Sequence, residues 1–116
     1  MRTISERLSD IQKAATRIMK YTPEGRDRYD HDEFLQAWII QNLYIVGEAT
    51  RAIASDFPAF KDQHPQIKWT KLFNMRTFLA HRYFAIDLGV VWSMAIESVP
   101  ELKRRIDAIL EQDKEV

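Results

Sequence analysis

The segment His31–Ala54, HDEFLQAWIIQNLYIVGEATRAIA, decides the fold because it has the pattern of one long helix. Asp30 and Glu33 have capping-box spacing at its start, where side chains bind free backbone amides. Apolar residues at helical spacing form a broad stripe, which consists of Phe34, Leu35, Trp38, Leu43, Val46, Ala49 and Ile53 and is widened by Ile39, Ile40, Tyr44 and Ile45. The helix therefore faces more than one neighbour, and it either is central or lies against a partner chain.

The segment before this helix predicts another amphipathic helix, from about Ile4 to Tyr21. Its apolar residues recur every three or four positions. Thr3 and Glu6 form a capping box at its start. Residues 22–25, TPEG, then end it through proline and glycine chemistry.

Three further helices are predicted after the long one. Residues 56–65 contain two prolines and are expected to be a connector with a short turn at most. A third helix begins near residues 66–69 and runs to about Phe84, and a fourth follows Asp87, its expected N-cap. Pro100 is expected to end or kink the fourth helix. A last helix covers residues 101–112.

Length and composition agree with a small helical protein. The 116 residues are enough for one domain, which we assign to residues 1–116. Apolar residues make up 46% and charged residues 29%, and only three glycines and four prolines occur, so helices are favoured over disorder or a turn-rich β fold. The expected fold is all-α: a four-helix up-down bundle with a short C-terminal fifth helix, joined by short loops.

Charge and special residues exclude several functions. The 17 basic and 17 acidic residues cancel, which rules out a broadly basic nucleic-acid coat and leaves only a local patch for RNA or DNA. The absence of cysteine removes disulfides, thiol catalysis and cysteine-bound zinc. The longest apolar-rich stretch, Ala37–Val46, is half the roughly 20 residues that a membrane span needs, so we expect a soluble, cytoplasmic protein without membrane contact.

One polar cluster, RTFLAHRY at residues 76–83, has residues suited to chemistry. Arg76 and Tyr83 lie seven residues apart and fall nearly on one line of a helix, whereas His81 is rotated by about 140° from Arg76. If the helix loosens near residues 80–84, all three side chains can approach one surface. The spacing alone also fits a histidine that favours the helix dipole and an aromatic residue at the edge of the core.

If the substrate is RNA, as the family resemblance described below implies, these residue types match the needs of cleavage by its 2′-hydroxyl. That reaction requires a base, an acid and positive charge beside the phosphorane. His81 transfers protons near neutral pH, and Arg76 offers a fork of donors to phosphate oxygens. One chain has a single motif histidine, so a two-fold dimer would supply both acid and base.

The region from Trp69 to Trp92 closely resembles the HepT-like ribonuclease toxins, which belong to the HEPN superfamily of all-helical proteins. The resemblance rests on the Arg-x4-His-x-Tyr motif at Arg76, His81 and Tyr83, on Trp69, Met75, Ile86-Asp87 and Val91-Trp92, and upstream on Val46-Gly47-Glu48-Ala49 and His64-Pro65.

The resemblance implies a homodimeric RNA endonuclease that works without metal or another cofactor, as the toxin of a type VII toxin–antitoxin pair. Arg76 and His81 would be catalytic, and Tyr83 would face the RNA. The implied partner is an MntA-like minimal nucleotidyltransferase antitoxin, which would transfer AMP from ATP to Tyr83 and so block the RNA site.

Several other polar residues near the motif could support the site or contact RNA. The family commonly has Asn, Asp or His after the motif arginine, but this chain has Thr77, whose hydroxyl can hydrogen-bond but cannot titrate. Glu48 either orients Arg76 or His81 or forms an ordinary ion pair, and Arg51 is a further polar candidate. Residues that can contact RNA phosphates or simply form a solvated face are Lys68, Lys71 and Arg82.

Two other classes of function remain open at this stage. The chain could be a non-catalytic subunit that binds substrate or nucleotide for a nucleotidyltransferase, or a plain helical dimerisation domain. Trp69 and Trp92 could stack on bases, although packing is favoured. No Gly-rich phosphate loop and no metal-ligand spacing occur in the sequence, so neither ATP hydrolysis nor a metal centre is expected.

Overall fold

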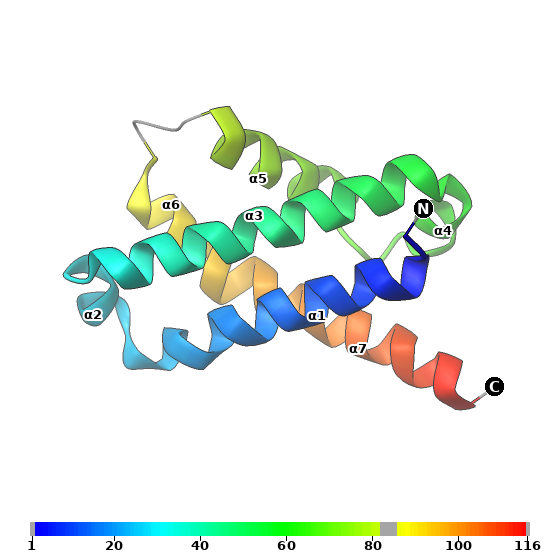
Figure 1. The fold of residues 1–116 in the computed structure, drawn as a ribbon, viewed down its shortest axis with the longest axis horizontal. Coiled ribbons are helices and arrows are strands. Elements are labelled where there is room, and N and C mark those ends of the chain that lie inside the picture. The colour runs from blue at the N-terminus through cyan, green and yellow to red at the C-terminus, as the bar shows by residue number, and fades with distance from the viewer. Residues whose placement is uncertain (1, 82–85, 116) are drawn as a thin grey trace.

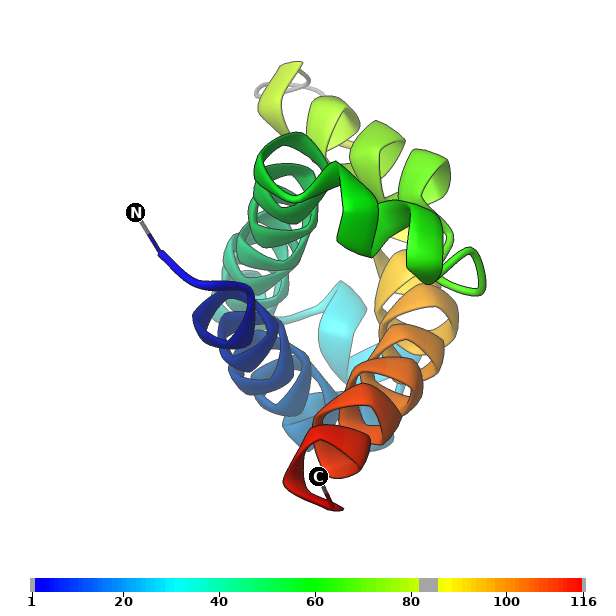
Figure 2. The same cartoon turned by 90° about the vertical axis from the view of Figure 1, so that its right-hand side faces the viewer.

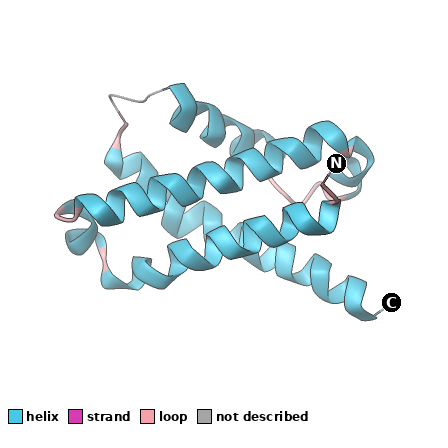
Figure 3. Ribbon diagram, in the orientation of Figure 1, coloured by secondary structure: helices cyan, strands magenta, loops and turns pink. Residues whose placement is uncertain are grey.

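The computed structural model describes residues 2–81 and 86–115, and their regular structure is entirely helical (Figure 3). The all-α fold class is thereby confirmed. The elements in chain order are α1 (Ile4–Tyr21), the 3₁₀ turn η1 (Thr22–Glu24), α2 (Arg26–Asp30), α3 (Glu33–Asp56), α4 (Pro58–Gln63), α5 (Trp69–His81), α6 (Leu88–Ser93), the π-helical segment η2 (Met94–Ser98) and α7 (Val99–Glu115).

Helix α3 is central, as its wide apolar stripe predicts. It runs along the molecule between α1 and α5, and α7 packs on the other side of α1 (Figure 1). Seen from the end, α1, α3, α5 and α7 surround a common interior (Figure 2). Both chain ends lie at the same end of the molecule as α4 (Figure 1).

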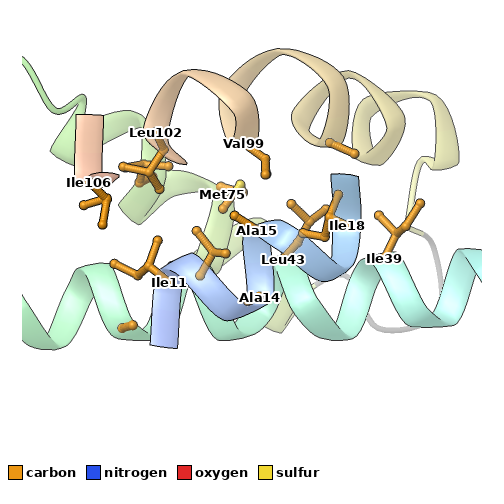
Figure 4. Packing of buried hydrophobic residues seen from close by; sticks show 14 of the residues in the cluster. Ile11, Ala14, Ala15, Ile18, Ile39, Leu43, Met75, Val99, Leu102 and Ile106 are labelled. Carbon is orange, nitrogen blue, oxygen red and sulfur yellow. The ribbon is translucent and has the colours of Figure 1, made fainter. Parts of the chain in front are cut away.

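The core is built from one face of each long helix. Ile11 and Ile18 of α1, Leu43 of α3, Met75 of α5 and Val99 of α7 are all buried in one cluster (Figure 4). Burying a side chain of this size contributes roughly 1.5–3 kcal/mol relative to an exposed one. The position of α5 is therefore set by packing against the helices that surround it.

The helix starts show which side chains cap them. Thr3 Oγ1 accepts a hydrogen bond from the Glu6 amide at 3.1 Å, and Asp87 accepts bonds from the Gly89 and Val90 amides, as the sequence predicts. Substituting such a cap by Ala typically costs about 1 kcal/mol.

The predicted start of the long helix is wrong by two residues. Asp32, not Asp30, is its N-cap and accepts from the Leu35 amide at 3.0 Å. The reason is the additional helix α2, in which Asp30 is the last residue and pairs with Arg26 across one turn. Helix α2 is anchored by Tyr29, whose buried ring donates its hydroxyl to the Leu88 carbonyl at 2.8 Å. Burial raises the pKa of this phenol to about 12.

The connector prediction for residues 56–65 is also wrong, because the structure places helix α4 there. Pro58 is the first residue of α4, where a proline nitrogen needs no hydrogen bond and its fixed φ suits a helix. The two prolines of this segment therefore delimit a helix rather than prevent one.

Pro100 does not end the helix in which it lies. Helices α6 and α7 are joined through η2 without a loop, so the predicted fourth and fifth helices are continuous. A proline cannot donate to the carbonyl four residues earlier, here Ile96, and its ring collides with that group in a regular α-helix. The wider π-helical turn directly before Pro100 relieves this collision.

Candidate active site

Helix α5 carries the polar motif, and its packing fixes which way Arg76 faces. Trp69 begins the helix and donates its indole N–H to the His64 carbonyl at 2.9 Å. Met75 and Leu79 point into the core. Trp69 and Trp92 are both buried, which agrees with the expected packing role rather than base stacking.

Gly47 allows α3 and α5 to approach each other beside Arg76. A Cβ atom at position 47 would lie 2.6 Å from Arg76 Cβ, which is too short for a real contact, and 3.1 Å from its Cα, which is unusually tight. The glycine of the Val46-Gly47-Glu48-Ala49 segment therefore has a steric function, because it lets the arginine backbone lie against α3.

Glu48 holds two arginines at this contact. Its Oε2 accepts from Arg76 Nε at 2.9 Å, and its Oε1 accepts from Arg51 Nε at 3.0 Å. The hydrogen bonds from Arg51 are the largest cause that lowers the pKa of the Glu48 carboxyl, partial burial opposes them, and the bond from Arg76 lowers the pKa further. Glu48 thus pairs with Arg76 rather than standing apart from the motif, and its role in orienting that arginine stays a prediction.

The Nη groups of Arg76 are left for another anion. Glu48 uses only the Nε of this guanidinium, and no residue in the described part of the chain accepts from its two Nη groups. The Arg76 side chain as a whole is 26% exposed. A guanidinium held by one edge presents the remaining donors to phosphate oxygens in a fixed orientation.

His81 is the last described residue of α5, and its backbone is still helical. In a regular helix it lies about 140° around the axis and about 7.5 Å along it from Arg76. Tyr83 and Arg82 lie outside the described residues, as does most of the segment expected to loosen. The convergence of Arg76, His81 and Tyr83 on one surface stays a prediction.

The supporting residues of α5 differ in exposure. Thr77 is half-buried directly after Arg76, and Lys71 is exposed. Lys68 precedes the helix, and its Nζ lies 3.5 Å from a carboxylate oxygen of Glu101 on α7. Arg105 of α7 lines the same hollow as Lys68 and Lys71. Arg105 was not among the residues predicted from the sequence. Its i,i+4 spacing from Glu101 shows only that the two share a face of α7, and it does not show that this face lies beside α5.

The described residues were also compared with what a metal site and a membrane span require. Within residues 2–81 and 86–115, no three His, Cys, Asp or Glu side chains are grouped as metal ligands would be. None of the helices described here is long and apolar enough to span a membrane.

The fold and this site define an all-helical protein whose motif arginine is bound to a glutamate of the central helix. Residues 11–109 match the family described as Ribonuclease HepT-like, and the chain therefore belongs to this family. The predicted family is thereby confirmed, and with it the prediction of an endoribonuclease.

Curated relatives of similar length support this membership. A protein of Thermococcus cleftensis named "Probable ribonuclease HepT" is 34% identical over 109 residues, which cover 93% of this chain and 96% of that protein. A protein of Methanocaldococcus jannaschii named "Putative RNase MJ1380" is 28% identical over 109 residues, which cover 93% of this chain and 97% of that protein. No solved structure matches the chain significantly.

Proposed function

We propose that the protein is a metal-independent RNA endonuclease toxin that cleaves RNA in the cytoplasm by 2′-hydroxyl transesterification. The observation that carries this proposal is the Arg76–Glu48 pair, which holds the guanidinium by its Nε and leaves its Nη donors for a phosphate. A phosphate that gains charge in the transition state is stabilised most by donors that are already oriented.

The reaction needs only groups that a dimer of this chain supplies. The base removes the proton of the 2′-hydroxyl, whose oxygen then bonds to phosphorus. The bond from phosphorus to the 5′-oxygen breaks, and the acid gives that oxygen a proton, which leaves a 2′,3′-cyclic phosphate and a 5′-hydroxyl. His81 of one subunit acts as base and that of the other as acid, with Arg76 at the phosphate.

The test of catalysis uses a labelled RNA incubated with purified protein in the presence of a chelator. The wild type is expected to cleave, and His81→Ala and Arg76→Ala are each expected to lose about 100-fold or more in rate. Cleavage that His81→Ala leaves unchanged contradicts the assignment. A wild type that binds RNA or nucleotide but cleaves nothing instead identifies a binding subunit of a nucleotidyltransferase complex.

The dimer is tested by mixing inactive chains. Heterodimers of His81→Ala and Arg76→Ala chains are formed by co-expression with two different affinity tags. If the site is shared across the two-fold axis, the heterodimer has an activity different from the sum of its two parent homodimers. Activity equal to that sum indicates independent sites.

We further propose that an MntA-like nucleotidyltransferase antitoxin neutralises the protein by modifying Tyr83. The phenolic oxygen attacks the α-phosphorus of ATP, pyrophosphate leaves, the phenol loses its proton, and AMP remains attached. The added bulk and negative charge would block an anion site beside Arg76. The test is the intact mass of protein expressed with and without the adjacent nucleotidyltransferase, because additions of AMP should vanish in Tyr83→Phe.

A further inference from the structure

A groove runs along the side of α5 that faces η2 and α7. Three adjoining hollows form it, and Lys71 lines all of them. The groove begins near Lys61 and Lys68, passes Lys71, and ends between Phe78 and Met94. Close helix packing in the described residues joins α1 to α3, α3 to α5 and α1 to α7, and does not include α5 with α7.

Cations from two helices meet in this groove. Lys68 directly precedes α5, Lys71 lies in its first turn, and Arg105 comes from α7. Glu101 lies between them, 3.5 Å from Lys68 Nζ and 3.7 Å from Arg105 Nε. Glu101 thus lies among three cations, and Lys61 and Asp62 line the outer end of the groove, so the groove is locally basic on a chain whose total charge is zero.

The floor of the groove is apolar. Ile67, Leu72 and Leu102 lie beneath the cations, and Met75 and Phe78 continue the floor along α5. Surfaces that bind single-stranded nucleic acid combine cations that follow the backbone with apolar or aromatic groups against the bases. The arrangement fits a polyanion with planar apolar groups better than a small anion.

The groove runs along α5 toward position 81 and not toward Arg76, which lies about 140° around the helix axis from Lys71 and faces α3. Asn74 lines the groove, and position 81 lies seven residues later in the same helix. Seven residues make almost two full turns, so position 81 is rotated by only about 20° from Asn74 around the helix axis. Lys71 is about 15 Å from position 81 along the helix axis, a length that several nucleotides span.

We propose that single-stranded RNA extends from the cleavage site along this groove, with its phosphates bound by Lys68, Lys71 and Arg105. The inference rests on the proposed function and adds a binding surface away from the reacting phosphate. It gives the enzyme a preference for RNA that continues for several nucleotides beside the cleaved bond.

The binding test uses a probe that the proposed reaction cannot cleave. A fluorescein-labelled oligothymidylate of about 12 nucleotides lacks the 2′-hydroxyl and matches the site size of single-strand binders. Its affinity is measured by fluorescence anisotropy at several salt concentrations. The wild type is compared with a groove variant, K68Q/K71Q/R105Q, and with a matched control on α1, K13Q/R17Q/K20Q, whose three cations are also exposed or nearly so.

The groove variant is expected to bind at least tenfold more weakly and to lose about 2 from the slope of log K against log salt, since each phosphate contact contributes about 0.7. Glu101→Gln removes the carboxylate that lies beside Lys68 and Arg105 and is expected to tighten binding about two- to fivefold. A groove variant with the wild-type slope, or a control that loses as much, overturns the proposal.

Two further comparisons separate this inference from its alternatives. A polyglutamate peptide that binds as tightly as the oligothymidylate and depends on the same three residues would assign the groove to an acidic protein segment and overturn the RNA proposal. The ratio of kcat/KM on long to short RNA is expected to fall at least tenfold in the groove variant. Because the anisotropy measurement involves no cleavage, an inactive wild type would contradict the proposed function without changing the binding result.

Discussion

Arg76 Nε and Glu48 Oε2 are 2.9 Å apart, and this contact joins the motif helix α5 to the central helix α3. Twenty-eight residues separate the two in sequence. The approach depends on Gly47, since any side chain at that position would overlap Arg76. The absence of a side chain at position 47 thus decides where the guanidinium of Arg76 lies.

Gly47→Ala is expected to destabilise the protein by about 1–3 kcal/mol, because its Cβ would lie 2.6 Å from Arg76 Cβ and the two helices must separate. Chemical unfolding measures this change. Gly89→Ala is the control, since a Cβ there would meet only side-chain ends, Asp87 Oδ1 at 3.2 Å and Arg26 Nη2 at 3.4 Å. Equal losses in the two variants would show that the helix contact at Gly47 is not special.

Glu48→Gln is expected to lower the free energy of unfolding by about 1 kcal/mol at pH 7, because the amide cannot form charge-assisted bonds to both arginines. The folded pKa of Glu48 is lowered from its ordinary 4.5, so its contribution is fully present above that value and is lost as the pH falls through the folded pKa. Urea unfolding of both proteins between pH 7 and about pH 3 should show the difference shrinking toward acid. A constant difference would mean that the carboxylate charge is not what stabilises the contact.

Arg76→Lys is expected to reduce RNA cleavage by about 100-fold, since an ammonium retains the charge but cannot bind Glu48 and a phosphate in the fixed geometry of a guanidinium. Arg51→Lys is the matched control, because Arg51 binds the same carboxylate from within α3. Cleavage rates on a common RNA compare the two. If Arg51→Lys loses as much, the role of the motif arginine is not distinct from that of its neighbour.

Asp32→Ala is expected to lower the midpoint of thermal unfolding, because the variant leaves the Leu35 amide without its cap. Asp30→Ala removes only an exposed pair with Arg26 and is expected to lower the midpoint less. Thermal unfolding ranks the two variants. The opposite order would restore Asp30 as the cap that the spacing of the sequence suggests.

The structure differs from the predicted helix boundaries at three places, and each difference has a local cause. Residues 26–30 are too short and too polar to show a helical period, so α2 was absent from the prediction and the cap was assigned to Asp30. Pro58 and Pro65 suggested a loop, although Pro58 occupies the one helical position where proline is favoured. Pro100 was expected to end or kink the helix, and it does not end it, because one widened turn keeps the helix continuous.

The sequence by itself determined the helical class, the central place of the long apolar helix, the caps at Thr3 and Asp87, and the family, since periodicity and a spaced motif are properties of the chain alone. Only the tertiary structure decided that Glu48, which pairs with Arg51 within α3, also binds Arg76 of α5, and that Arg105 meets Lys68 and Lys71 in one groove. Such contacts depend on how closely and at which rotation two helices pack. The packing of side chains across the core sets the distance and the rotation between two helices, and the periodicity of a single helix contains no information about either.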